Sequence, residues 1–213
     1  MTPPIKIIAF DLETTGRMSE GSSRWQDQCG ITQIGAACVE YLPTHPMSEE
    51  NRLGVSMRWE ITDRFNTYID PEMPEDRWHA EAIEKTGISP DTVKDAPNLL
   101  MAHADLANFF VGATHSITYN GEWFDYPVLQ YQLQRYGLDK NFPWPPCHID
   151  LMKYGADWYE KAGKRGIKRP TLGELYEVVT GQELQDAHDA MADITATVEI
   201  FIKKGGLEGL GYL

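Results

Sequence analysis

Two carboxylates stand two residues apart where an apolar run of the chain ends. Asp11 and Glu13 follow the run KIIAF at Lys6–Phe10, which predicts a buried strand. Residues two apart in a strand point to the same side of a sheet, so both carboxylates would be aimed at one point. Two solvated acids at a strand end explain the tripeptide equally well. On its own, this pair leaves both interpretations open.

A further carboxylate follows a second short apolar segment. Ser116–Tyr119 predicts a short strand, the Asn-Gly pair at 120–121 a tight turn, and Asp125 comes at the start of the next helix. Pro127 supports that start, because a helix tolerates proline only in its first turn. Taken alone, Asp125 is better explained as the N-cap of this helix.

His188 and Asp193 form the third feature. Five residues along a helix turn through about 500°, which leaves the two side chains roughly 140° apart. They converge only if His188 precedes the helix and Asp193 lies in its first turns, and Asp189 fits this placement as the N-cap. By themselves they are explained as an exposed histidine and a solvated acid.

Together the three features predict a site for divalent cations. Asp11, Glu13, Asp125 and Asp193 would gather at neighbouring strand and helix ends, where like charges raise one another's pKa. Oxygen ligands suit Mg²⁺ or Mn²⁺ rather than zinc. Two such ions about 4 Å apart suit in-line displacement at phosphorus. A nearby histidine, here His188, is suited to take the proton of an attacking water near neutral pH.

The surrounding elements predict a mixed sheet flanked by helices. Further strands are expected at Ile31–Val39 and Val55–Ile69. Because no clear helix separates the first three strands, we expect them to form an antiparallel meander. The helices are expected at Trp78–Thr86, Asn98–Val111, from near Asp125 to Tyr136, from the capping box Thr171–Glu174 to Gly181, and at Ala190–Lys204.

Length and composition fit one globular domain over residues 1–213. The chain has 213 residues, 42% of them hydrophobic and 24% charged, and domains average about 150 residues. No apolar run reaches the roughly 20 residues that a membrane span needs, and the N-terminus lacks the pattern of a secretory signal. The three cysteines have no CxxC spacing and favour a reducing compartment. We therefore expect a cytoplasmic protein without a membrane partner.

The net charge of −13 argues against binding nucleic acid through a basic surface. It does not exclude a carboxylate cluster that becomes locally cationic when it holds metal.

The three motifs resemble those of a known family. DLETTG at Asp11–Gly16, YNGEWFD at Tyr119–Asp125 and HDAMAD at His188–Asp193 look, in this order, like the exonuclease motifs of the DEDD superfamily. The subtype resembled is the DnaQ-like histidine subtype, because the histidine stands five positions before the last aspartate. The third motif is especially similar to that of bacterial exonuclease I. The resemblance extends from about Ile5 to Phe201.

The resemblance implies a ribonuclease-H-like α/β fold with a mixed five-stranded sheet, two Mg²⁺ or Mn²⁺ ions, and 3′→5′ removal of nucleoside 5′-monophosphates. It implies that His188 is the general base. It implies four metal ligands: Asp11, Glu13, Asp125 and Asp193. It also implies residues that contact the terminal nucleotide or shape the site: Thr14, Thr15, Gly16, Asn120 and Phe124.

Three features lie outside the family pattern or need a choice. The Arg17–Gly30 connection is longer than usual, and either contacts a ligand or is a tolerated surface insertion. Trp123 either stacks on a base or packs against a helix. A basic cluster between the second and third motifs favours contact with the phosphate backbone, above all through Lys164 and Arg165, over a solvated loop. The cluster comprises Lys161, Lys164, Arg165, Lys168 and Arg169.

We expect a 3′→5′ exonuclease that acts on single-stranded 3′ ends, with DNA favoured over RNA. The alternatives are an exoribonuclease, a nuclease of very short oligonucleotides, and a non-catalytic end-binding module. The last would be expected to lack a carboxylate or the histidine, and all five residues are present. The expected partners are single-stranded DNA or RNA ends, with a homodimer or a polymerase partner left open.

Overall fold

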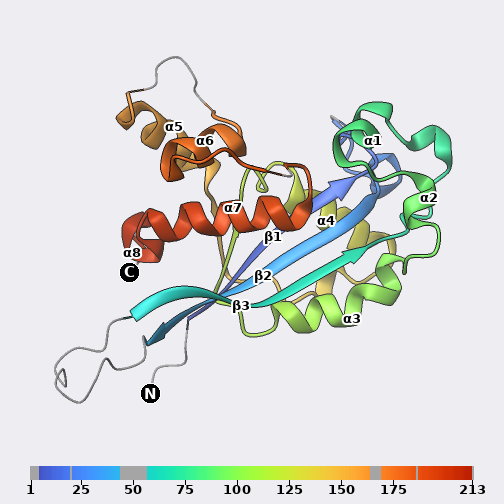
Figure 1. The fold of residues 1–213 in the computed structure, drawn as a ribbon. Helices are drawn as coiled ribbons and strands as arrows, with labels where there is room; N and C mark the ends of the chain where they lie inside the picture. The colour runs from blue at the N-terminus through green and yellow to red at the C-terminus, as the bar shows by residue number, and fades with distance from the viewer. Residues whose placement is uncertain (1–4, 20, 44–56, 164–168, 186, 213) are drawn as a thin grey trace, which may run out of the picture.

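Five strands form one mixed sheet with the order β3-β2-β1-β4-β5 (Figure 1). The computed structural model describes residues 5–19, 21–43, 57–163, 169–185 and 187–212. The first three strands pair antiparallel, and the last two are parallel to β1. The strands are β1 (Lys6–Thr14), β2 (Ile31–Pro43), β3 (Met57–Tyr68), β4 (His115–Thr118) and β5 (Cys147–Asp150).

Helices cover both faces of the sheet (Figure 1). One face carries α3 (Leu99–Phe110) and α4 (Asp125–Arg135), and the other carries α6 (Leu172–Thr180), α7 (Ala190–Lys203) and α8 (Gly206–Leu210). The remaining helices are α1 (Ala80–Thr86), α2 (Pro90–Val93) and α5 (Met152–Lys161), with 3₁₀ turns at Trp25–Asp27, Glu75–Arg77 and Asp139–Asn141.

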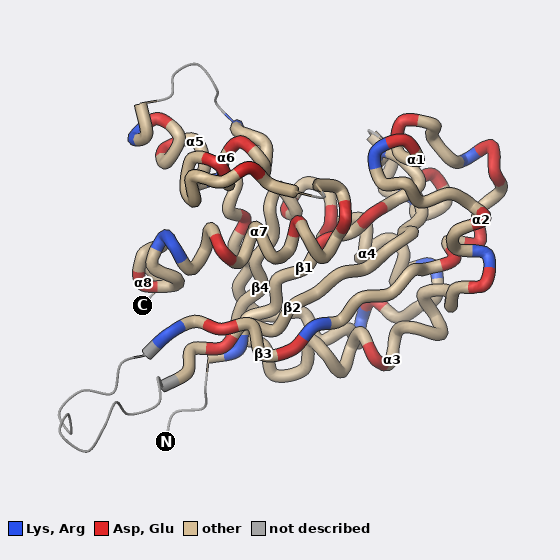
Figure 2. Tube along the Cα trace, in the orientation of Figure 1, with Lys and Arg blue, Asp and Glu red and all other residues tan. Residues whose placement is uncertain are grey.

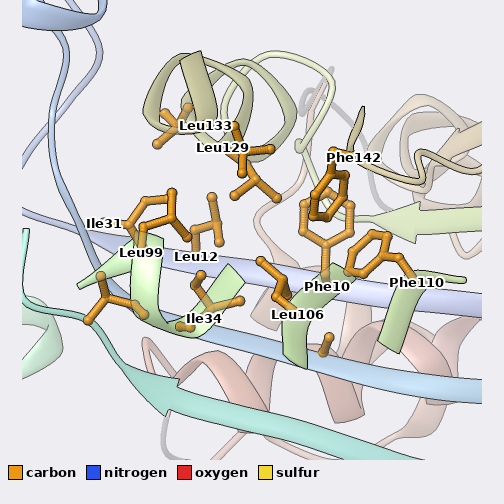
Figure 3. Close-up of a cluster of buried hydrophobic side chains, with 14 of the residues drawn as sticks. Phe10, Leu12, Ile31, Ile34, Leu99, Leu106, Phe110, Leu129, Leu133 and Phe142 are labelled. Atoms are coloured by element: carbon orange, nitrogen blue, oxygen red, sulfur yellow. The ribbon is translucent and has the colours of Figure 1, made fainter. Parts of the chain in front are cut away.

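The alternation of side chains along β1 divides the core in two. Phe10 and Leu12 point toward α3 and α4, where they pack with Leu129 and other buried side chains (Figure 3). Ile7 and Ala9 point to the opposite face and pack in the cluster that α7 covers. A strand continues this alternation as long as it stays paired, so the pairing of β1 decides which face its next residues reach.

The carboxylates lie inside β1, not beyond its end. Asp11 and Glu13 continue the row that faces α7, and Asp11 is paired in register with Gly35 of β2. The missing side chain at Gly35 lets the first turns of α7 lie close to the sheet. An added Cβ would stand 2.7 Å from Cδ1 of Ile194 and 3.0 Å from Cβ of Ala190. Close approach of α7 therefore depends on this glycine.

Most of the predicted architecture is confirmed. The antiparallel meander, the α4 start at Asp125, and the capping box and Gly181 stop of α6 are as expected. The expected Trp78–Thr86 helix begins only at Ala80. The strand expected at Val55–Ile69 is confirmed from Met57, and residues 55–56 lie outside the described residues. Four helices and strands were not located from the sequence: α2, β5, α5 and α8.

The described helices lack the combination of length and apolarity that crossing a bilayer requires.

The packing of α7 on β2 yields a stability prediction. Gly35→Ala should lower the free energy of unfolding by about 1–3 kcal/mol, because the new methyl group overpacks a filled interface. The matched control is Gly173→Ala within α6, where an added Cβ meets nothing within 4 Å. That change should be neutral or stabilising by up to about 1 kcal/mol through helix propensity. Urea denaturation measures both, and equal stability of the two variants would contradict the close approach.

Candidate active site

Three carboxylates from β1 and α7 converge on one point. Oxygen atoms of Asp11, Glu13 and Asp193 all lie within 4.8 Å of one another. Oδ2 of Asp193 accepts the backbone N–H of His188 at 3.3 Å. Its Oδ1 is buried and finds no hydrogen-bond partner among the described residues. A buried carboxylate oxygen without a partner is costly, and a divalent cation is the partner that this arrangement of oxygens fits.

Asp125 comes from the opposite face of the sheet and lines the same cavity, but it is not one of the three carboxylates whose oxygens lie within 4.8 Å of one another. The β1–β4 pairing ends at Ala9 and Ile117, so the N–H of Leu12 lies beyond that ladder. Oδ1 of Asp125 accepts this N–H at 3.0 Å. The N-cap position of α4 is occupied by Phe124, and Asp125 stands in the first helical turn. Its carboxylate therefore connects α4 to β1, and the N-cap explanation of Asp125 is wrong.

The electrostatics of the four carboxylates are those of an uncompensated cluster. Burial, followed by the charges of Asp193 and Asp125, raises the pKa of Glu13 to about 8. Burial and then the charge of Asp125 raise the pKa of Asp11 well above its ordinary value. Burial also raises the pKa of Asp125 and of Asp193. Ionising all four without a cation is therefore unfavourable.

His188 stands at the entrance of α7. It is exposed and has a φ of +71°, and the next residue, Asp189, is the N-cap of α7. Asp189 accepts the N–H groups of Met191 and Ala192, both at 3.0 Å. Asp193 follows in the first turn of the helix. The predicted placement of His188 before the helix and Asp193 within it is thus what the structure shows.

His188 lines two neighbouring cavities. The larger one, of about 430 Å³, is also lined by all four carboxylates and by Asn120. The smaller one, of about 150 Å³, is also lined by Glu13, Thr14, Gly16 and Phe124. The exposed imidazole is therefore accessible both from the cavities and from solvent.

Two other residues predicted to contact the substrate, Thr15 and Trp123, line neither of these cavities. Thr15 is buried, and its hydroxyl accepts the N–H of Gly30 at 3.1 Å, so it holds the Arg17–Gly30 connection. Trp123 is 65% exposed and lines neither cavity. Lys164 and Arg165 lie outside the described residues.

Asp150 is a site residue that the sequence analysis missed. It ends β5, is 3% exposed, and its Oδ1 accepts the N–H of Asn120 at 2.8 Å and of Met152 at 3.0 Å. Its Oδ2 accepts the N–H of Glu122 at 3.3 Å. Asp150 therefore holds the loop that leads to Asp125. The signal that could have located it is the one used for Asp11, an acid at the end of a short apolar segment.

The chain is similar in sequence to one protein family and in fold to several solved nucleases. The exonuclease family model, RNase_T, matches residues 8–201. No curated protein sequence matches the chain. Among solved structures, E. coli exonuclease I with a dT13 oligonucleotide aligns at a TM-score of 0.65 and 22% identity, over 97% of this chain and 42% of that chain. The zinc-bound E. coli exonuclease I–single-stranded DNA complex aligns at 0.63 and 23%, over 94% and 40%.

A nuclease of a different description shares the fold. Cell-death related nuclease 4 (CRN-4) aligns at a TM-score of 0.63 and 18% identity, over 95% of this chain and 64% of that chain. The chain thus spans about two fifths of the exonuclease I chains that it matches. At these identities the structural likeness shows the mixed five-stranded sheet flanked by helices.

The raised carboxylate pKa values predict how metal-free stability depends on pH. The folded-state pKa of Glu13 is about 8, against an ordinary value of 4.5. At pH values between these two pKa values the folded chain binds more protons than the unfolded chain, so the free energy of unfolding falls as pH rises. In EDTA, Tm should therefore be lower near the upper end of this pH range than near its lower end. Mg²⁺ or Mn²⁺ should raise Tm most at the higher pH.

Glu13→Gln should flatten the fall of Tm with pH in EDTA, whereas Glu160→Gln on the exposed side of α5 should not. Thermal melts monitored by circular dichroism across the pH range measure this. An unchanged pH profile in Glu13→Gln would refute the electrostatic account of the cluster.

Proposed function

The chain belongs to the RNase_T exonuclease family, and from that premise we propose that it is a divalent-metal-dependent 3′→5′ exonuclease of single-stranded nucleic acid. We propose DNA as the favoured substrate and nucleoside 5′-monophosphates as the products. The observation that carries the proposal is the convergence of Asp11, Glu13 and Asp193, with an unpartnered buried oxygen, beside the exposed His188.

The residues present fit Mg²⁺ or Mn²⁺. The donors are all carboxylate oxygens, which these ions prefer. Asp11, Glu13 and Asp193 would hold the metal, with Asp125 completing a site for two ions. Bound metal would supply activation of water and stabilisation of charge on the phosphate oxygens.

The residues of the chain divide the remaining work of the proposed reaction. His188 takes a proton from the water that attacks the terminal phosphorus, because its side chain lines the cavity that the carboxylates share. A bond forms between this water oxygen and phosphorus as the bond from phosphorus to the 3′-oxygen breaks. That 3′-oxygen takes up a proton and remains on the shortened strand. The terminal nucleotide would occupy the 150 Å³ cavity against Thr14, Gly16 and Phe124.

Several observations support the proposed substrate, the single-domain organisation and the cytoplasmic location. Solved exonuclease I structures with the same fold include complexes with a dT13 oligonucleotide and with single-stranded DNA. The third motif of this chain also resembles that of bacterial exonuclease I. The two cores share β1, which supports a single exonuclease domain over residues 1–213. The three cysteines are free, which fits the proposed cytoplasmic location.

One observation favours a second candidate, a nuclease of very short oligonucleotides. Among the described residues, Lys85 is the one lysine or arginine that lines the 430 Å³ cavity, so few cations are there to hold a long strand. Comparing cleavage of dinucleotides with that of strands of about 20 nucleotides separates the two, because extended single-strand sites usually hold several nucleotides.

A product ladder tests the proposed function. Matched single-stranded DNA and RNA, labelled at the 5′ end, should shorten stepwise from the 3′ end in Mg²⁺ or Mn²⁺ and stay intact in EDTA. The released products should be nucleoside 5′-monophosphates, and DNA should shorten faster than RNA. Immediate release of the labelled nucleotide, or no cleavage with either metal, would contradict the proposal.

Two variants separate the proton transfer from the metal site. His188→Ala should lower kcat by about 10²–10⁴-fold, the usual contribution of a general base, and keep the rise of Tm that Mn²⁺ produces. Asp11→Asn should abolish turnover and reduce that Tm rise, because a ligand is lost. Steady-state kinetics and thermal melts measure both effects. Normal turnover in His188→Ala would remove the general-base assignment.

A further inference from the structure

A lysine stands where the two cavities of the site meet. Lys85, in the last turn of α1, lines both the 430 Å³ cavity and the 150 Å³ cavity. Arg17 joins it along the smaller cavity. Lys85 is thus placed between the space proposed for the terminal nucleotide and the space in which the carboxylates gather.

The charge of Lys85 is paired with an acid outside the carboxylate cluster. Its Nζ lies 3.0 Å from Oε1 of Glu81, one turn earlier in α1. Nη2 of Arg17 lies 3.0 Å from the same oxygen. Acidic and basic residues stand side by side on α1 (Figure 2). The Lys85 and Glu81 side chains are about half exposed, and that of Arg17 is more so. Ion pairs in contact with water contribute little to stability, so an anion is able to take the place of Glu81.

The larger cavity beside Lys85 is otherwise acidic. The chain has a net charge of −13, and four carboxylates line the larger cavity. Among the described residues that line this cavity, Lys85 is the one lysine, and its ammonium group has three N–H donors. Resting on the proposed nuclease function, we propose that Lys85 contacts a phosphate oxygen of the substrate strand where it passes between the two cavities. Glu81 limits the availability of this positive charge.

A purely structural explanation of Lys85 has to be separated from this one. A lysine in the last turn of a helix is favoured by the helix dipole and by its ion pair with Glu81. Lys94 offers a matched control, because it caps the C-terminus of α2, pairs with Asp91 at 3.3 Å and is exposed. Lys94 lines none of the cavities described for this chain.

The test compares Lys85→Gln, Glu81→Gln and Lys94→Gln. The affinity for a 5′-fluorescein single-stranded dT oligonucleotide is measured by anisotropy in Mg²⁺ at several salt concentrations, in the His188→Ala background where turnover is slow. Lys85→Gln should raise Kd about fivefold near 0.1 M salt and reduce the slope of log K against log salt by about 0.7, as loss of one phosphate contact implies. In the background with His188 intact, it should raise KM more than it lowers kcat.

Glu81→Gln should lower Kd, and Lys94→Gln should leave both Kd and salt slope unchanged. This opposition is the decisive readout, because Lys85→Gln and Glu81→Gln break the same ion pair. A structural role predicts that both variants shift Kd in the same direction, and that result would overturn the proposal. An unchanged Kd or salt slope in Lys85→Gln would also overturn it.

Failure of the proposed function gives a different pattern. If the chain with His188 intact binds the oligonucleotide but never cuts it, the exonuclease proposal fails, and the opposed shifts of Kd still support the Lys85 contact. If that chain cuts normally and Lys85→Gln matches it in KM and Kd, the Lys85 contact alone fails. If the chain neither binds nor cuts, both are overturned.

Discussion

Repulsion among the partly buried carboxylates of one site is the constraint on which the rest of this molecule depends. Asp11, Glu13 and Asp193 bring their oxygens within 4.8 Å of one another, and burial raises the pKa of each. Folding that brings such groups together without a cation costs free energy. The surrounding elements must therefore provide enough packing to hold β1 and α7 against that repulsion. Protons and divalent cations compete for the same oxygens, so the stability of the fold and the affinity for metal depend on pH together.

The carboxylates are held in place by backbone groups, by a glycine and by an acid just outside the cluster. The alternation of β1 aims Asp11 and Glu13 at α7, and the absent side chain of Gly35 lets α7 approach. Asp125 is fixed by a backbone N–H that β4 is too short to pair. Asp150 in turn accepts the N–H groups of the loop that leads to Asp125. Each contact fixes a direction for a carboxylate, and together they gather residues from both faces of the sheet.

The starts of α4, α6 and α7 could be predicted from the sequence, because each is set by interactions within a few residues. The proline near the start of α4, the capping box of α6 and the N-cap at Asp189 are interactions within a few residues, and the structure has all three. Pairing with β2 carries β1 through Asp11 and Glu13, whereas the apolar run alone had suggested that the strand stops before them. Propensity does not show this, because acids are depleted from strands and only tertiary pairing holds these two there.

The parts that sequence reasoning missed depend on partners far along the chain. β5 has four residues, and its pairing with β4 is what makes it a strand. The role of Asp150 exists only once β5 lies beside the strand that precedes Asn120. Gly35 matters because α7 packs directly against it, and the sequence around Gly35 does not show which helix packs there. The candidate catalytic residues could thus be identified from residue type and spacing, whereas the residues that orient them could be identified only from the structure.

The same electrostatics connect metal, substrate and the acidic surface. With four carboxylates in one cavity and a net charge of −13, the metal-free chain repels a phosphate backbone. Two divalent cations in the cluster would neutralise its four carboxylates without changing the acidic surface elsewhere. In the proposed function, Lys85 then acts on a phosphate oxygen at short range, where salt screens a pair of charges least. The proposed exonuclease would therefore bind the end of a strand mainly through groups inside the site, because the net charge of the chain is −13.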